Sequence, residues 1–351
     1  GGSAPIVRFV LGMIAAMGAL VFLGCPWRAI LRLAGGDGNA ILGLAGLATG
    51  IWFGTLFFKK GYSLGRSNSQ SVVSGALFPV IAVCLLLLYL IFPQIPDQPQ
   101  SGPLFYSVKG PGSQHAPFIA SLGLAFIIGI FAQRSRFCTM GAFRDLFLFR
   151  YTHLFLGLAA MFAAAFIANA LTGGLKFGFE GQPVAHSDFL WNYLGMVTAG
   201  LAFALAGGCP GRQLFMAGEV DSDAGIFALG MLVGAAMAHN LGTASSGTGI
   251  GVYGMQATII GFAVCLIIGF VHSKKAKRSI AMRTIDTRGL SCPQPLVLFH
   301  QAIAENADTP LDVLVDNEAS LENVTRAAEK KGWNVTPKDE GEGVFRLELR
   351  K

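Results

Sequence analysis

Charged residues are scarce over the first three quarters of this 351-residue chain. Residues 1–272 contain 13 lysines and arginines and 8 aspartates and glutamates, whereas residues 273–351 alone contain 13 and 12. An ordinary soluble domain is about one quarter charged, so this scarcity excludes one over residues 1–272. The net charge of +6 comes mostly from basic residues beside apolar segments, and no base-reading motif accompanies it. Nucleic acid is therefore excluded as a partner.

Cysteine is also rare, with six in the whole chain. This number excludes the disulfide framework of a small secreted domain, which would be far denser in cysteine. The sequence has no Cys-x-x-Cys pair, which argues against a dithiol redox site. It also lacks a second Cys or His pair at ligand spacing, so we expect no metal and no cofactor.

Long apolar runs dominate the first part of the chain. A run of about twenty apolar residues is long enough to cross a bilayer. Eight such runs are present, at roughly 5–24, 40–58, 72–93, 117–133, 152–172, 189–208, 224–241 and 253–272. With eight spans, the basic loops 58–67, 133–145 and 273–278 fall on one side, which should be cytoplasmic, and the weakly charged loop 94–116 falls outside. The pattern predicts a polytopic α-helical membrane protein of about eight or nine transmembrane helices, with short re-entrant helices.

An internal repeat runs through these apolar segments. Cys25, Cys138 and Cys209 each close an apolar run, and a helix rich in small residues follows, whose first glycine comes 18, 19 and 21 residues after the cysteine, respectively. Transporters are often built from such repeats, and their substrate path lies where the repeats meet. The three cysteines are therefore candidates for one shared path.

Cysteine precedes proline three times, at Cys25, Cys209 and Cys292, where the composition predicts fewer than one such pair. Proline is favoured at the first position of a helix, so each cysteine should stand at a helix N-terminus. There the free N–H groups and the helix dipole stabilise a thiolate or a bound anion. The alternative is that proline merely starts a helix and cysteine is a small hydrophobe. Two membrane copies of Cys-Pro-x-Arg favour the functional interpretation.

The arginines Arg28 and Arg212 follow their cysteines by three residues, nearly one helical turn. They are candidates for attracting an anion to the thiol. The alternative is that each arginine only extends its side chain to the membrane interface, which is common at helix ends. Cys138 lacks the proline and lies among several arginines, which a positive cytoplasmic loop would also explain.

Residues 282–351 have the pattern of a small soluble domain. Strand and helix signals alternate in the order βαβαββ, with a final hairpin that turns at Glu340–Gly343. This predicts a two-layer α/β domain, joined to the membrane domain 4–272 by a basic linker, 273–281. Cys292 should begin the first helix of this domain as Cys-Pro-Gln-Pro, where its thiol would be accessible and acidified.

The tail, with "DTRGLSCPQP", resembles the TusA/SirA-like sulfur-carrier domains over its whole length. The resemblance implies that Cys292 carries a persulfide. The membrane part resembles the YeeE/YedE family of inner-membrane proteins over nearly all of 5–272, through "GCPWR", "LRLAGGDGNA", "RSRFCTMG" and "GGCPGR". It looks closest to the YedE branch linked to selenium metabolism, and other members take up thiosulfate. The family path is lined by central cysteines, which implies this role for Cys25, Cys138 and Cys209.

These observations together predict a transporter of the bacterial inner membrane rather than an enzyme. It would import thiosulfate or a selenium counterpart and pass sulfur or selenium to Cys292 of a cytoplasmic C-terminal domain. Downstream acceptor proteins would then receive it. Two alternatives stay open at this point. One is a membrane-anchored sulfurtransferase in which the membrane part is a scaffold. The other is a general ion channel, against which the thiols count.

Overall fold

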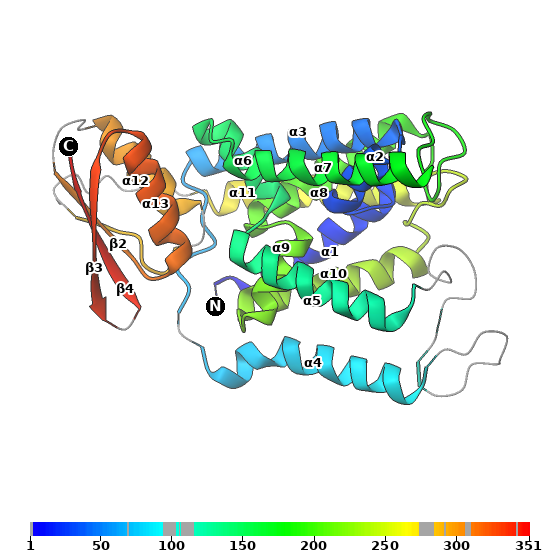
Figure 1. The fold of residues 1–351 in the computed structure, drawn as a ribbon, viewed down its shortest axis with the longest axis horizontal. Helices are drawn as coiled ribbons and strands as arrows, with labels where there is room; N and C mark the ends of the chain where they lie inside the picture. Colours follow the sequence, from blue (N-terminus) through cyan, green and yellow to red (C-terminus); the bar gives the residue numbers. More distant parts are fainter. Residues whose placement is uncertain are drawn as a thin grey trace.

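The computed structural model describes residues 3–68, 70–93, 103–104, 106, 116–273, 284–290, 293–305, 310–341 and 343–351. Within these ranges the chain forms a helical membrane domain (residues 3–273) and a small C-terminal domain (residues 284–351), which lies against one end of the helices (Figure 1). The basic linker expected at 273–281 lies, apart from its first residue, outside the described residues.

The membrane domain consists of helices that are long and apolar enough to span a bilayer. Its helices are α1 (Pro5–Phe22), α2 (Pro26–Ala34), α3 (Asn39–Lys59), α4 (Val72–Ile91), α5 (Phe118–Ser135), α6 (Thr139–Phe149), α7 (His153–Thr172), α8 (Phe189–Ala206), α9 (Pro210–Gly218), α10 (Ser222–Asn240) and α11 (Gly254–Val271). By length and composition they make eight candidate spans. This confirms the polytopic fold predicted from the apolar runs.

Three of the eight spans are broken into a long and a short helix. The pairs are α1 with α2, α5 with α6, and α8 with α9. Each break falls at one of the repeat cysteines, so the expected short helices begin directly after Cys25, Cys138 and Cys209. Broken helices of this kind place free helix N-termini inside the membrane domain.

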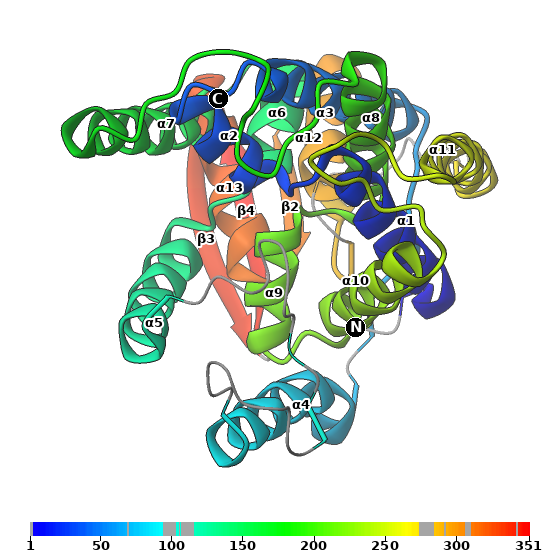
Figure 2. The same cartoon turned by 90° about the vertical axis from the view of Figure 1, so that its right-hand side faces the viewer.

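Helix α8 forms the centre of the membrane domain, and thirteen of its eighteen residues are buried. It packs between α1 and α3 (Figure 2). Gly50 of α3 lies directly against the backbone carbonyl of Val197, where a larger side chain would clash. At the periphery, α4, α5 and α7 each bury a single residue and expose apolar side chains, as helices that face lipid do.

The C-terminal domain has the predicted order βαβαββ. Its elements are β1 (Thr284–Asp286), α12 (Gln294–Glu305), β2 (Leu311–Val315), α13 (Glu318–Lys330), β3 (Asn334–Gly341) and β4 (Val344–Arg350). The strands form one sheet in the order β1-β2-β4-β3, and only β1 and β2 pair in parallel. The helices α12 and α13 lie between the sheet and the membrane domain (Figure 1). Helix α12 begins at Gln294, two residues beyond the predicted start at Cys292, which lies outside the described residues.

Candidate functional site

Cys25 and Cys209 adopt the same backbone conformation at the start of a short helix. Cys25 precedes α2 with φ −75° and ψ 170°, and Cys209 precedes α9 with φ −71° and ψ 165°. The proline that follows each cysteine occupies the first helical position, where its missing N–H removes no hydrogen bond. The Cys-Pro signal therefore produces two equivalent helix starts, as predicted.

Cys138 starts α6 without a proline, and its thiol caps the helix instead. The Sγ atom of Cys138 accepts a hydrogen bond from the N–H of Gly141 at 3.3 Å. The thiol of Cys209 lies beside that of Cys138. The backbone N–H groups of Thr139 and Arg212 lie near the Cys209 sulfur. The N-termini of α6 and α9 thus meet with two thiols between them.

The first turn of α2 joins the same junction through Trp27. The indole lies 5.8 Å from the ring of Phe137 and 5.9 Å from that of Phe215, measured between ring centroids. It also packs on Gly211, where a Cβ atom would stand only 2.7 Å from the indole Cζ2. Glycine at this position therefore lets the indole reach the first turn of α9. We call this junction the cysteine centre, formed by Trp27, Cys138, Thr139, Cys209 and Gly211.

The three path cysteines differ in their surroundings. Cys138 and Cys209 are both buried and lie next to each other. Cys25 is half-buried and stands two residues before Trp27. Among the described residues, the interactions of the Cys138 and Cys209 thiols do not include Cys25. The structure therefore brings two of the three together and places the third at the neighbouring helix start.

Both Cys-Pro-x-Arg arginines lie within the first turn of their helices. The Arg28 side chain lies over Gly24, where a Cβ atom would stand 2.9 Å from the arginine Cδ. The Nη1 atom of Arg212 is 3.7 Å from Glu219 Oε1, and its side chain is 14% exposed. Arg28 Nε and Arg212 Nη1 are buried without a hydrogen-bond acceptor in the described part of the chain. They are not side chains extended toward solvent.

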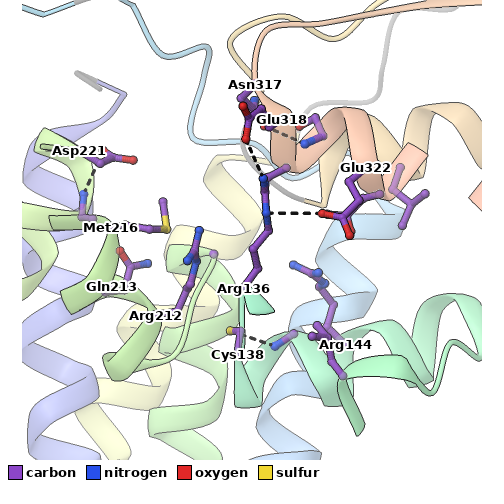
Figure 3. A pocket seen from close by; sticks show the side chains of 18 of the residues that line it. Arg136, Cys138, Arg144, Arg212, Gln213, Met216, Asp221, Asn317, Glu318 and Glu322 are labelled. Carbon is purple, nitrogen blue, oxygen red and sulfur yellow. Dashed lines mark hydrogen bonds and ion pairs between the residues drawn. The ribbon is translucent and has the colours of Figure 1, made fainter. Parts of the chain in front are cut away.

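A cavity of about 560 Å³ connects the cysteine centre with the C-terminal domain. Cys138 and Arg212 line its inner end, and residues of α13 line its outer end (Figure 3). Leu290 and Leu296, which flank Cys292 in the sequence, also line this cavity. Cys292 itself lies outside the described residues.

Five arginines and seven acidic side chains line the cavity, so its wall carries both signs of charge. Arg136 reaches α13 and pairs with Glu318 at 3.3 Å and Glu322 at 3.6 Å, as Figure 3 shows. Deeper in the wall, Arg8 lies 3.4 Å from Asp223, and both side chains are at least 93% buried. Arg144, Arg212 and Arg136 lie on three sides of the space above Cys138 (Figure 3). The positive charge nearest Cys138 therefore comes from these three arginines.

An aromatic contact fixes the C-terminal domain to the end of α6. The ring of His300 stacks on Phe149 with 4.6 Å between centroids, and Tyr151 Oη is 3.4 Å from His300 Nε2. The ammonium group of Lys330 lies 4.3 Å from the centre of the Tyr151 ring. Burial, assisted by the positive charge of Lys331, lowers the pKa of His300 to about 4. The contact therefore holds this histidine in its neutral form.

A second contact joins the loop after α3 to the start of the C-terminal domain. The side-chain amide of Gln294 donates to the carbonyl oxygen of Tyr62, and the Ser67 N–H donates to the Gly289 carbonyl at 2.7 Å. Arg66 pairs with Asp286 at 3.2 Å. Together with the Arg136 and His300 contacts, these interactions make up what we call the docking interface.

The motif "LRLAGGDGNA" has a structural role at the opposite end of the membrane domain. Arg32 Nε pairs with Asp37 Oδ2 at 2.6 Å, and Arg32 Nη1 donates to the Phe22 carbonyl at 2.8 Å. Asp37 also accepts from the backbone and side-chain N–H groups of Asn39. This network ties the end of α2 to the start of α3.

Sequence reasoning missed Trp27, Thr139 and the partners of Arg136. Trp27 and Thr139 belong to the quoted motifs "GCPWR" and "RSRFCTMG", so the motifs contained a signal that the focus on cysteine and arginine passed over. Arg136 pairs with residues 182 and 186 positions away, which no local pattern reveals.

The fold and the site define a class: a multi-pass membrane protein whose broken helices meet at cysteines, joined to a small α/β domain. Residues 134–291 match the family described as sulphur transport, and residues 283–351 match the family described as sulfurtransferase TusA. A protein of Methanocaldococcus jannaschii named as a sulfur carrier is 37% identical over 73 residues, which are 20% of this chain and 97% of that protein. The chain therefore combines a segment of the sulphur transport family, residues 134–291, with a TusA-family C-terminal domain, residues 283–351.

Proposed function

We propose that this protein imports thiosulfate, or its selenium counterpart, across the bacterial inner membrane. The path passes Cys25, Cys209 and Cys138 and ends at Cys292 of the cytoplasmic C-terminal domain. The observation that carries the proposal is the cavity with Cys138 at one end and the neighbours of Cys292, Leu290 and Leu296, at the other. The basic residues on the side of the C-terminal domain support a cytoplasmic orientation for that side.

The cysteine centre has the chemistry that a thiosulfate-like ion needs. A dianion has no place in hydrocarbon, because even one charged side chain there is costly. The N-termini of α2, α6 and α9 and the charges of Arg28 and Arg212 replace part of the lost hydration. The polarizable thiols of Cys138 and Cys209 suit a terminal sulfur or selenium atom. This combination favours thiosulfate over sulfate, which has no such atom.

The hand-over to Cys292 balances without an added oxidant or reductant. The Cys292 thiolate attacks the terminal sulfur of thiosulfate and forms a new S–S bond. The bond from that sulfur to the sulfonate group breaks, and its electron pair leaves on sulfite. The products are the Cys292 persulfide and sulfite, with a total charge of −3 on each side. With selenosulfate, the same step gives a selenopersulfide. A downstream acceptor protein then takes the persulfide sulfur.

Uptake of radiolabelled thiosulfate into vesicles with reconstituted protein tests the path. Cys138→Ala, Cys209→Ala and Cys25→Ala should each abolish uptake. Cys84→Ala is the matched control, because Cys84 lies on the exposed surface of α4. Selenite, sulfite and sulfate as competitors define the substrate. Uptake at the wild-type rate by all three path variants would contradict the cysteine path.

Cys292→Ala separates transport from hand-over. We expect this variant to accumulate label but to form no persulfide on the C-terminal domain. The same two measurements on the wild-type protein are the control. If wild-type vesicles never accumulate label while Cys292 still becomes a persulfide, the protein is a membrane-anchored sulfurtransferase and the import proposal is wrong.

A further inference from the structure

Buried donors without acceptors gather at the cysteine centre. In the part of the chain that the structure describes, seven buried side-chain polar atoms have no hydrogen-bond partner. Four of them belong to the first turns of α2, α6 and α9: Trp27 Nε1, Arg28 Nε, Thr139 Oγ1 and Arg212 Nη1. A buried polar group without a partner is destabilising, so native proteins contain few of them. Their concentration at one junction points to a ligand.

The Thr139 hydroxyl is the clearest of the four. Thr139 has no exposed surface and occupies the first position of α6. There the hydroxyl has no carbonyl one turn earlier in its own helix to bond with. Its backbone N–H lies near the thiol of Cys209. The hydroxyl is thus held beside the two thiols with an unused hydrogen.

The indole of Trp27 packs at the first turn of α9 in the same junction. The indole Cε2, which is bonded to Nε1, would be 3.0 Å from a Cβ atom on Gly211. Gly211 is the second residue of α9 and follows Cys209 by two positions. The rings of Phe137 and Phe215 hold the indole in place. Trp27 Nε1 therefore borders the first turn of α9.

We propose that Trp27 and Thr139 bind the oxygen atoms of the transported anion while Cys138 and Cys209 contact its terminal sulfur or selenium. The inference rests on the proposed function and specifies its substrate class: a small oxyanion with one terminal chalcogen. Neutral N–H and O–H groups donate hydrogen bonds to oxyanion oxygens without adding charge, so they do not trap the ion as further arginines would. The thiols contact the terminal sulfur or selenium atom. They therefore distinguish the ion from other oxyanions, which the N–H and O–H donors cannot do because they bind only oxygen.

This site forms only when the two thiols separate. The cavity ends at Cys138, and Cys209 and Thr139 lie behind it with no exposed surface. The ion therefore meets these donors beyond the inner end of the cavity, during its passage. Interactions made only there lower the barrier to passage, so they raise the maximal rate of uptake rather than the apparent affinity.

Thr139→Val is the sharpest test, because valine replaces the hydroxyl by a methyl group of similar size. Measured with thiosulfate in reconstituted vesicles, the maximal uptake rate should fall about tenfold, since a hydrogen bond to a charged group is being lost. The half-saturating concentration should stay within about twofold of wild type, because the contact is made only during passage. Thr139→Ser keeps the hydroxyl and should keep wild-type uptake. Trp27→Phe removes the N–H but keeps an aromatic ring, and we expect a similar loss.

Thermal unfolding separates a ligand role from a structural one. Thr139→Val removes an unpartnered buried hydroxyl, so its melting temperature should equal or exceed that of the wild type. Thr55→Val is the matched control. Thr55 is equally buried, but its hydroxyl donates to the Trp52 carbonyl at 2.7 Å, so uptake should be unchanged.

The outcomes distinguish failure of this inference from failure of the proposed function. If Thr139→Val and Trp27→Phe transport like wild type while Cys138→Ala does not, the donors have no role and the cysteine path stands. If Cys25→Ala, Cys138→Ala and Cys209→Ala all transport normally as well, the proposed cysteine path itself is wrong. A lowered melting temperature of Thr139→Val would make its hydroxyl structural and would overturn the inference.

Discussion

The cysteine centre and the docking interface both consist of polar groups brought together by distant segments, but they differ in how those groups are satisfied. At the docking interface, Arg136 is 29% exposed and pairs with Glu318 and Glu322, whose side chains are 81% and 51% exposed. In the cysteine centre, Thr139 has no exposed surface and its hydroxyl has no partner among the described residues. Exposed pairs that are already satisfied suit reversible docking, whereas buried unsatisfied donors suit a ligand.

The contrast is sharpest between two arginines that line the same cavity. Arg136 forms ion pairs with two carboxylates of the C-terminal domain, Glu318 and Glu322. Arg212 lies beside the thiols, and its nearest carboxylate oxygen is 3.7 Å away. A partly buried guanidinium with a distant partner retains much of its capacity to attract an anion. The two arginines should therefore have separable effects on uptake and on docking.

Among the variants that test the difference between the cysteine centre and the docking interface, Arg212→Gln should give the largest effect, a loss of uptake. Loss of a charged hydrogen-bonding partner for the anion costs up to about 3 kcal/mol, which corresponds to about a hundredfold in the uptake rate at low thiosulfate concentration. Docking of the C-terminal domain should not change, because Arg212 pairs within the membrane domain, with Glu219. Uptake into vesicles and hydrogen exchange of α13 measure the two effects.

Glu219→Gln is the control for this substitution. It removes the partner of Arg212 but leaves the arginine charge, so uptake should stay within about threefold of wild type, as for an exposed ion pair. Equal losses in both variants would mean that the ion pair, and not the arginine charge, is the functional unit. The distinction between the centre and the interface would then fail.

Sequence analysis predicted the features that depend on local signals. The apolar runs predicted the spans, and Cys-Pro predicted the helix starts at Cys25 and Cys209, which have nearly identical backbone angles. The meeting of Trp27 with Gly211, and of Cys138 with Cys209, arises from packing between segments far apart in the chain. No local pattern encodes such contacts. The sequence therefore predicted the parts of the site but not their arrangement.

Arg136→Gln should weaken docking while leaving the centre intact. Exposed ion pairs contribute about 0.2–1 kcal/mol each, so loss of both pairs should lower the docking equilibrium constant severalfold. Salt screens such pairs, and the difference from wild type should disappear near 1 M salt. Hydrogen exchange of the first turn of α13 reports docking. Arg134→Gln is the matched control, because Arg134 is exposed on the last turn of α5, two residues away. Equal exchange in the two variants would exclude Arg136 as a docking residue.

The smallest expected effect is the pH dependence of docking through His300. Burial lowers its pKa in the docked state to about 4, against an ordinary value of 6.5, so the undocked state binds the proton more readily. Docking is therefore strongest above pH 6.5 and weakens as the pH falls from 6.5 toward 4. Because solvent still reaches part of the ring, the docking constant should fall only about twofold to threefold at pH 6.

His300→Phe isolates this contribution, because phenylalanine can stack on Phe149 but does not titrate. Hydrogen exchange of α13 between pH 7.5 and 6, corrected for the intrinsic exchange rate, should then be independent of pH in the variant. If the variant keeps the wild-type pH dependence, His300 does not carry it and the assignment to the aromatic contact is wrong.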